Sequence, residues 1–218
     1  MFVSNVSHEL RTPLAALMGE LDLALQKERT VEQYKNAITN AWTDARRMTK
    51  LIDGLLNLAR ADYQKEQIRM QDIRLDELLL DVREHILKAH PDYKISLLFE
   101  QEDADDDLLI TVKGNLYLLS IAFSNLIENN CKYAADRSSC IQISYWEKWT
   151  IVRFSDDGVG MTEEEKKHLF QLFYRGKDHM QVDGYGIGLA LTHKIITMHN
   201  GNILVHTKQG EGTTFVVE

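Results

Sequence analysis

Cysteine is scarce in this sequence, and its scarcity excludes the classes of protein that depend on it. Only Cys131 and Cys140 occur among the 218 residues, separated by polar residues and without a cluster of cysteine and histidine around them. A disulfide scaffold or a structural zinc site needs more of these side chains at metal-ligand spacing. We therefore predict that both cysteines are reduced thiols.

Long apolar runs are also missing. No uninterrupted stretch reaches the ~20 residues that a membrane-spanning helix needs, and the N-terminus lacks the basic-then-apolar layout of a signal peptide. We expect the chain as given to be soluble and to make no membrane contact. Low-complexity tracts are absent, and 44% hydrophobic and 27% charged residues are usual for a globular protein. This excludes disordered and fibrous classes, and the length allows one large domain or two modest ones.

The sequence has no excess of basic residues. Lysine and arginine number 25 against 33 aspartates and glutamates, giving a formal net charge of −8, which disfavours a general nucleic-acid binder. Six of the carboxylates lie within residues 100–107, and without them the formal charge would be −2. The acidic total is therefore compatible with a local phosphate site elsewhere.

The first third of the chain has a helical pattern. Apolar residues recur at helical spacing from Val3 to Leu25 and again from Val31 to Asp62, close to a heptad step in each segment. The pattern predicts an antiparallel pair of helices joined near residues 27–30. Because two amphipathic helices cannot enclose a core alone, we expect two copies to pair as a four-helix bundle in a homodimer.

Strand-like and helix-like patterns alternate after Tyr63. The polar stretch 64–72 predicts a linker or an edge strand. Two hairpins are expected, one from strands 95–99 and 108–112 around the acidic run, and one from strands 141–145 and 150–154. The remaining predicted elements are the helices 76–88, 115–133, 162–173 and 186–198 and the strands 203–206 and 213–217. This pattern predicts an α+β domain with one sheet and helices on one face.

Two asparagines in the predicted helix 115–133 form a first candidate site. Asn125 and Asn129 lie one turn apart and are followed by Lys132 and Tyr133, so one helix face offers two amide oxygens near a cation. Amide oxygens suit Mg²⁺, which completes its shell with waters and phosphate oxygens. Taken alone, two asparagines at this spacing are more typical of a solvated helix face than of a metal site.

Glycines mark two further candidate sites. Asp156 follows a predicted strand and precedes Gly158 and Gly160, an arrangement that can present a carboxylate to a ligand amine such as that of adenine, although it is also an ordinary turn. Gly184, Gly186 and Gly188 precede a helix, where backbone amides can cradle phosphate. No strand leads directly into them, which disfavours a dinucleotide fingerprint. With Arg175 and Lys177 at its start, the stretch 176–183 fits a phosphate-covering lid better.

Six motifs in order resemble those of the sensor histidine kinases of two-component systems. Residues 7–14, Ser-His-Glu-Leu-Arg-Thr-Pro-Leu, resemble the phosphoacceptor box of that family, and residues 125–133 resemble its asparagine box. The glycine boxes correspond to residues 156–160 and 184–189, the phenylalanine box to 170–175, and the closing glycine-threonine element to 210–215. The resemblance spans almost the whole chain.

The resemblance implies a dimerisation and phosphotransfer domain at residues 1–66 and a catalytic ATP-binding α/β sandwich with a mixed sheet at residues 67–218. It implies that His8 is phosphorylated from ATP and passes the phosphoryl group to an aspartate of a response regulator. A neighbouring carboxylate can accept a proton from the imidazole, so we expect Glu9 to be the base. The resemblance assigns Thr12 to phosphatase activity toward the regulator. Pro13 cannot donate to the carbonyl of Glu9, which predicts a kink beside His8.

In the ATP site the resemblance makes Asn129 the main Mg²⁺ ligand, with Asn125 as a metal or phosphate contact. Lys132 and Arg175 are expected at the phosphates, Tyr133 at the ribose or base, and Asp156 at the adenine amine. Phe170 and Phe173 are expected to anchor the lid. The other expected cofactor-binding residues are Gly158, Gly160, Gly184, Gly186, Gly188, Leu189 and Thr213.

Two alternatives stand beside the kinase. One is an ATP-driven clamp of the gyrase or Hsp90 kind, which is disfavoured because Asn125 occupies the position where that branch has a water-activating glutamate. The other is a module that binds a response regulator without catalysis. Asn130, where the family usually has alanine, is a departure that predicts unusual packing behind the helix. We expect the full-length protein to be a membrane-anchored receptor of the bacterial inner membrane, with this chain on the cytoplasmic side.

Overall fold

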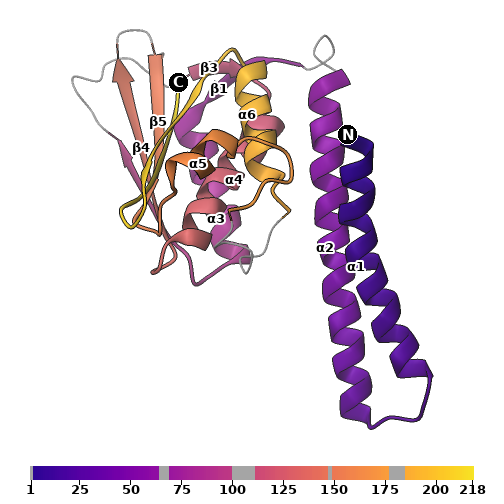
Figure 1. The fold of residues 1–218 in the computed structure, drawn as a ribbon. Helices are drawn as coiled ribbons and strands as arrows, with labels where there is room; N and C mark the ends of the chain where they lie inside the picture. Colours follow the sequence, from indigo (N-terminus) through magenta and orange to yellow (C-terminus); the bar gives the residue numbers. More distant parts are fainter. Residues whose placement is uncertain (1, 64–68, 100–110, 147–148, 177–184) are drawn as a thin grey trace. The chain divides into compact units, whose positions relative to one another are not determined.

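The computed structural model describes residues 2–63, 69–99, 111–146, 149–176 and 185–218. The chain divides into two compact units, with the boundary between Ala59 and Arg60 (Figure 1). The predicted acidic turn at 100–107, Lys177 and Gly184 lie outside the described residues. Cys131 and Cys140 are both free thiols, as predicted.

The first unit is a hairpin of two long helices, α1 (Phe2–Leu25) and α2 (Val31–Tyr63). Its turn is closed by the Arg29 guanidinium, which donates from Nε to the Leu23 carbonyl at 2.9 Å. Thr30 and Gln33 cap α2 reciprocally, since each backbone N–H donates to the other side chain, at 3.1 and 3.2 Å. The predicted helix pair and its junction are confirmed.

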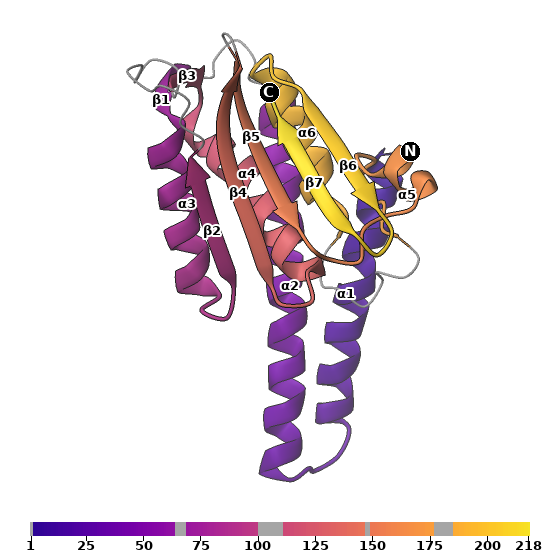
Figure 2. The ribbon, with the colours of Figure 1, turned by 90° about the vertical axis from the view of Figure 1, so that its left-hand side faces the viewer.

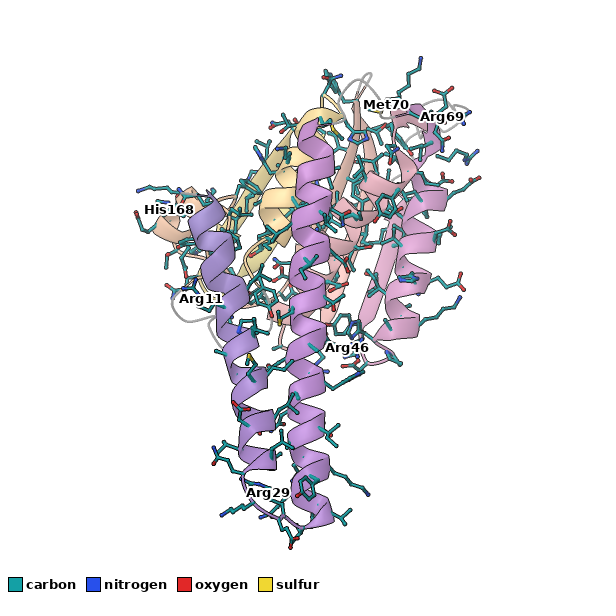
Figure 3. The ribbon with its side chains drawn as sticks, turned by 90° about the vertical axis from the view of Figure 1, so that its right-hand side faces the viewer. Arg11, Arg29, Arg46, Arg69, Met70 and His168 are labelled. Carbon is teal, nitrogen blue, oxygen red and sulfur yellow. The ribbon has the colours of Figure 1, made fainter. Side chains whose placement is uncertain are left out.

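Few apolar residues are buried in the part of the hairpin whose side chains are described. Its buried apolar residues, among those whose side chains are described, are the small Ala24, Ala37 and Ala41. Large apolar side chains are exposed instead, with Met18 at 55% and Ile38 at 63% of their full accessibility. The others in this exposed set are Leu14, Leu21, Leu23, Leu25, Val31, Tyr34, Trp42, Ile52 and Leu56. Figure 3 draws these side chains, with Arg29 near the turn and Arg46 along α2. No described helix is apolar over enough of its length to cross a membrane.

The second unit contains two sheets. The larger has strand order β2-β4-β5-β7-β6, in which β2 and β4 run parallel and every other neighbouring pair is antiparallel. Its strands are β2 (Lys94–Phe99), β4 (Ser138–Trp146), β5 (Trp149–Asp156), β6 (Ile203–Lys208) and β7 (Gly212–Val217). The helices are α3 (Leu75–Ala89), α4 (Leu116–Tyr133), α5 (Glu163–His168) and α6 (Gly188–Met198). Figure 2 shows the sheet in front of α3, α4 and α6, which confirms a mixed sheet with these helices on one face.

The core lies between α4, α6 and the sheet. The rings of Phe123 in α4 and Phe154 in β5 are 5.4 Å apart between centroids, and Ile127, Ile141 and Ile195 are fully buried around them. Asn130 is also fully buried, and its Nδ2 donates to the Ser139 hydroxyl at 3.1 Å. This polar pair packs behind α4 at the position where the sequence predicts unusual packing.

The first predicted strand hairpin is wrong. Strand β3 (Thr111–Gly114) does not pair with β2 but with β1 (Gln71–Arg74), in a separate two-stranded antiparallel sheet. Strand β2 instead pairs with β4. The prediction of one sheet is wrong for the same reason. Strands β2 and β3 each pair with a strand that is distant in sequence, and the two pairings belong to separate sheets. The second predicted hairpin, β4 with β5, is confirmed.

Helix α5 is shorter than predicted. It begins after a capping box in which Thr162 and Glu165 satisfy each other's backbone N–H groups, and it ends at His168 rather than at Phe173. Phe173 has a φ of 65°, in the left-handed region that no helix residue adopts, and its N–H donates to the Gly186 carbonyl at 2.9 Å. None of the residues of α5 is buried, so core packing does not stabilise a longer helix.

Candidate functional site

Helix α4 supplies one wall of a cavity of about 170 Å³ in the second unit. The Asn115 side chain caps this helix by accepting from the Leu118 N–H at 3.0 Å. Leu126, Ile127 and Cys131 face the core. The opposite face lines the cavity with Asn125, Glu128, Asn129, Lys132 and Tyr133. The predicted polar face of this helix is therefore part of one hollow.

Lys132 is paired with a carboxylate at this wall. Its Nζ lies 3.0 Å from Oε2 of Glu128, one turn earlier, and both side chains are about one-third exposed, at 33% and 32%. A phosphate entering the cavity would compete with Glu128 for this ammonium group.

Asn125 connects α4 to α6. Its Nδ2 lies 3.3 Å from the Gly188 carbonyl and 3.5 Å from the Thr192 hydroxyl. The amide nitrogen of Asn125 therefore faces the start of α6.

Asp156 forms the floor of the cavity at the end of β5. Val152, Phe154 and Asp156 occupy the alternate, inward-facing positions of this strand, so the carboxylate is only 8% exposed. Burial raises the pKa of Asp156 from 3.8 to about 6, although hydrogen bonds from the backbone of Gly158 and Thr213 oppose the shift. The Gly158 N–H donates to Oδ1 at 2.8 Å. Asp156 therefore presents a largely ionised acceptor at neutral pH.

Gly158 supports this carboxylate from outside the cavity lining. A Cβ on Gly158 would lie 2.5 Å from the Tyr133 carbonyl oxygen and 2.6 Å from Oδ1 of Asp156. Only glycine permits this approach of α4, the turn and the carboxylate. Gly160, the next predicted glycine, lines the cavity itself.

The described part of the predicted phosphate-binding segment also lines the cavity. Arg175, Gly186, Gly188 and Leu189 line it. Burial raises the pKa of Tyr133, while the charge of Arg175 lowers it, so these two side chains influence each other across the cavity. Gly186 has a φ of 67°, and a Cβ there would lie 2.5 Å from the Tyr174 carbonyl oxygen. Within the described residues no side chain caps the start of α6.

Aromatic contacts hold residues 170–174, which follow α5. The Phe170 ring packs on His193 of α6 at 4.8 Å, and the Tyr174 ring lies 5.5 Å from His168. Figure 3 labels His168 in α5. Phe170 and Phe173 are absent from the described cavity lining, whereas Tyr174 lines it. The role of the two phenylalanines as anchors of the lid stays a prediction.

Eleven predicted binding residues line this cavity, together with several residues that the sequence did not predict. The eleven are Asn125, Asn129, Lys132, Tyr133, Asp156, Gly160, Arg175, Gly186, Gly188, Leu189 and Thr213. The unpredicted ones include Glu128, Val159, Met161, Glu165, Leu169 and Tyr185. For Glu128 a signal existed, because it precedes Lys132 by one turn on the same helix face.

The cavity fits a magnesium nucleotide better than a metal ion alone. No group of three or more His, Cys, Asp or Glu side chains that could hold a metal occurs among the residues with described placement. The oxygen donors that α4 offers are the amides of Asn125 and Asn129 and the carboxylate of Glu128, which is paired with Lys132. A hard cation would therefore need phosphate oxygens to complete its coordination.

The predicted catalytic residues lie in the first unit. His8, Glu9 and Thr12 belong to α1, which continues through Pro13 to Leu25. His8 and Thr12 are four residues apart and thus share a helix face. The predicted kink at Pro13 stays a prediction.

Comparisons with known proteins agree with this division. Residues 1–64 match the His Kinase A (phospho-acceptor) domain, and residues 114–218 match the histidine kinase-, DNA gyrase B- and HSP90-like ATPases. The heme sensor protein HssS of Staphylococcus saprophyticus is 30% identical over 99% of the chain and 45% of its own length. The phosphate regulon sensor protein PhoR of Pseudomonas aeruginosa is 31% identical over 98% of the chain and 48% of its length.

The fold is also similar to a solved structure. The histidine kinase ThkA, in its crystal structure in complex with the response regulator protein TrrA, has a TM-score of 0.73 at 21% identity, over 99% of this chain and 60% of that one. The chain spans less than half the length of the two curated relatives. Its phosphoacceptor and ATPase domains, in that order, place the chain in the family of two-component sensor histidine kinases, as their catalytic core.

Proposed function

We propose that this chain uses ATP to phosphorylate its own His8 and then transfers the phosphoryl group to an aspartate of a response regulator. The observation that carries the proposal is the single cavity that gathers Asp156, Asn129, Lys132 and Arg175 in a chain whose first helix contains His8 in a phosphoacceptor domain. The functional domains we propose are residues 1–66 and 67–218.

When bound, Mg-ATP supplies the phosphoryl group and the metal charge that offsets the phosphates. Asp156 accepts a hydrogen bond from the adenine amine, and Tyr133 packs against the ribose or base. Asn129 holds the metal, Asn125 adds a metal or phosphate contact, and Lys132 and Arg175 neutralise phosphate charge. The backbone around Gly158, Gly160, Gly184, Gly186 and Gly188, with Leu189 and Thr213, completes the site.

At the phosphoacceptor, one imidazole nitrogen of His8 attacks the γ-phosphorus while Glu9 accepts the proton from the other nitrogen. A nitrogen–phosphorus bond forms, the bond between phosphorus and the bridging oxygen breaks, and ADP leaves with that electron pair. Thr12 orients a water that hydrolyses the phosphorylated regulator. The structure of ThkA with a response regulator supports a partner of this kind.

The assembly we propose is a homodimer in which two α1–α2 hairpins form a four-helix bundle. The exposed large apolar side chains of the hairpin support it. The named relatives are sensor proteins, and we propose that the full-length protein is likewise a membrane-anchored receptor with this part in the bacterial cytoplasm.

Labelling with γ-phosphate-labelled ATP tests the function. We expect an acid-labile phosphoprotein from the native chain and none from His8→Gln, which should still bind nucleotide. Asp156→Asn should lose both labelling and binding. Labelling that persists in His8→Gln would refute the assignment of His8, and steady ATP hydrolysis far faster than labelling would favour an ATP-driven clamp.

A further inference from the structure

Three inward-facing side chains form a row across β6, β7 and β5 at the floor of the cavity. Thr207 pairs with Thr213 in the register of β6 and β7, and Thr213 pairs with Asp156 in the register of β7 and β5. Asp156 and Thr213 line the cavity, while Thr207 is absent from its lining. Thr207 lies behind Thr213 and belongs to none of the six motifs.

The Thr207 hydroxyl makes three contacts. It accepts a hydrogen bond from the Met161 N–H at 2.9 Å, lies 3.0 Å from the Gly212 carbonyl oxygen, and lies 3.0 Å from the Thr213 hydroxyl. A hydroxyl has one proton and two lone pairs. Because a carbonyl oxygen can only accept, the proton of Thr207 goes to Gly212. The contact with Thr213 then requires Thr213 as the donor.

This assignment determines what Thr213 offers a ligand. Its only proton is directed at Thr207, so towards the cavity it presents lone pairs. Asp156, its neighbour in the row, presents a carboxylate whose lone pairs also accept. A ligand group that meets both must donate two hydrogen bonds, as the exocyclic amine of adenine does. The carbonyl oxygen found at the same purine position in guanine or hypoxanthine would face acceptors only.

We propose that Thr207 is a positioning residue that makes the site select a purine with an amine at position 6, by holding the Thr213 hydroxyl in the accepting orientation. The inference rests on the proposed binding of ATP. Without the Thr207 hydroxyl, Thr213 is free to turn and donate to a carbonyl oxygen. The selectivity for the amine should then weaken while the phosphate contacts stay in place.

The test compares the dissociation constants of ATP and inosine triphosphate, which share sugar and phosphates and differ in the 6-substituent and the proton at N1. We expect the native chain to prefer ATP, and Thr207→Val to reduce that preference about tenfold, the effect of one neutral hydrogen bond. Thr207→Ser, which keeps the hydroxyl, should keep the native preference for ATP. Thr207→Ala provides a second variant without the hydroxyl if valine disturbs folding.

Thr214→Val is the matched control. Its hydroxyl lies 2.9 Å from the Ser155 hydroxyl, at positions of β7 and β5 that face away from the cavity. This variant loses a comparable hydroxyl pair and should keep the native preference. An unchanged preference in Thr207→Val and Thr207→Ala would overturn the role of Thr207 while leaving ATP binding intact. A native chain that binds neither nucleotide would overturn the proposed function itself, and the inference with it.

Discussion

Asp156 combines a buried position with a charge that the proposed site needs. Its carboxylate continues the inward row of Val152 and Phe154, where an apolar side chain would fit a strand better. The hydrogen bonds from Gly158 and Thr213 stabilise the charged form only in part, because burial still raises its pKa to about 6. The folded protein therefore retains a charge that favours ligand binding at the expense of stability.

This conflict predicts a pH-dependent stability. Since the pKa of Asp156 is raised on folding from 3.8 to about 6, the folded state binds more protons than the unfolded state between these values, and stability falls as pH rises through this range. Relative to Asp156→Asn, the native chain should have lost about 3 kcal/mol of its free energy of unfolding when the pH reaches neutrality. Urea unfolding of both proteins at pH 4 to 7 measures this loss. A difference between them that does not vary with pH would contradict the burial argument.

Glu128 lies 3.0 Å from Lys132 at the wall of the cavity, and this ion pair predicts how the affinity for phosphate can be raised. Partly exposed ion pairs contribute up to about 1 kcal/mol. Glu128→Gln should therefore increase the affinity for ADP without Mg²⁺ by up to about fivefold, because Lys132 no longer needs to leave a carboxylate.

Calorimetric titration of the native chain, Glu128→Gln and Lys132→Gln with ADP would measure this effect. The lysine variant should bind more weakly than the native chain. If Glu128→Gln also bound more weakly, Glu128 would be a direct contributor to nucleotide binding rather than a competitor for Lys132.

At the level of elements, α4 determines the position of one wall of the cavity, and the start of this helix depends on one side chain. Asn115 accepts from the Leu118 N–H, while its own N–H donates to Nε2 of His199 at 2.9 Å. Asn115→Ala removes the first bond and should lower the free energy of unfolding by about 1 kcal/mol. Asn115→Asp keeps the cap but loses the bond from Nδ2 to the Arg69 carbonyl at 3.3 Å, so its stability should lie between those of the native chain and Asn115→Ala. Urea midpoints measure both, and an unchanged midpoint in Asn115→Ala would mean that water replaces the cap.

Elements that rest on local signals could be predicted from the sequence, and those that rest on distant pairing could not. The cap at Asn115 and the apolar period that follows lie within one segment, so α4 was predicted correctly. Strands β2 and β3 follow each other along the chain but pair with β4 and β1. No local property of residues 94–99 specifies that their parallel partner is β4, a strand that follows α4 in the sequence.

The same distinction applies to the site. Asn129, Asp156 and the glycines belong to recognisable motifs, and the structure gathers the described ones around one cavity or directly behind it. Thr207 lies in no motif, and its contact with Thr213 depends on the register of β6 and β7. Its role requires the hydrogen-bond geometry, because composition and spacing do not distinguish it from other strand threonines.

At the level of the whole molecule, the two units obtain their stability differently. The second unit encloses a core of large side chains such as Phe123, Phe154 and Phe215. The hairpin buries mainly alanines in its described part and leaves large apolar residues exposed. A unit with that surface gains stability from association, whereas the described residues that line the cavity all belong to the second unit.

This asymmetry predicts that association and nucleotide binding can be separated by one substitution. Ile38, 63% exposed on α2, should lie in the interface of the proposed dimer, and Ile38→Glu would place a charge in that apolar contact. We expect sedimentation to show a monomer, circular dichroism to show an earlier loss of helix, and ADP affinity to stay at the native value. Asn36→Glu is the control, since Asn36 is about 200° around the helix from Ile38 and should leave the dimer intact. A dimer that survives Ile38→Glu would place the interface elsewhere, because a buried carboxylate at its centre could not be accommodated without a partner.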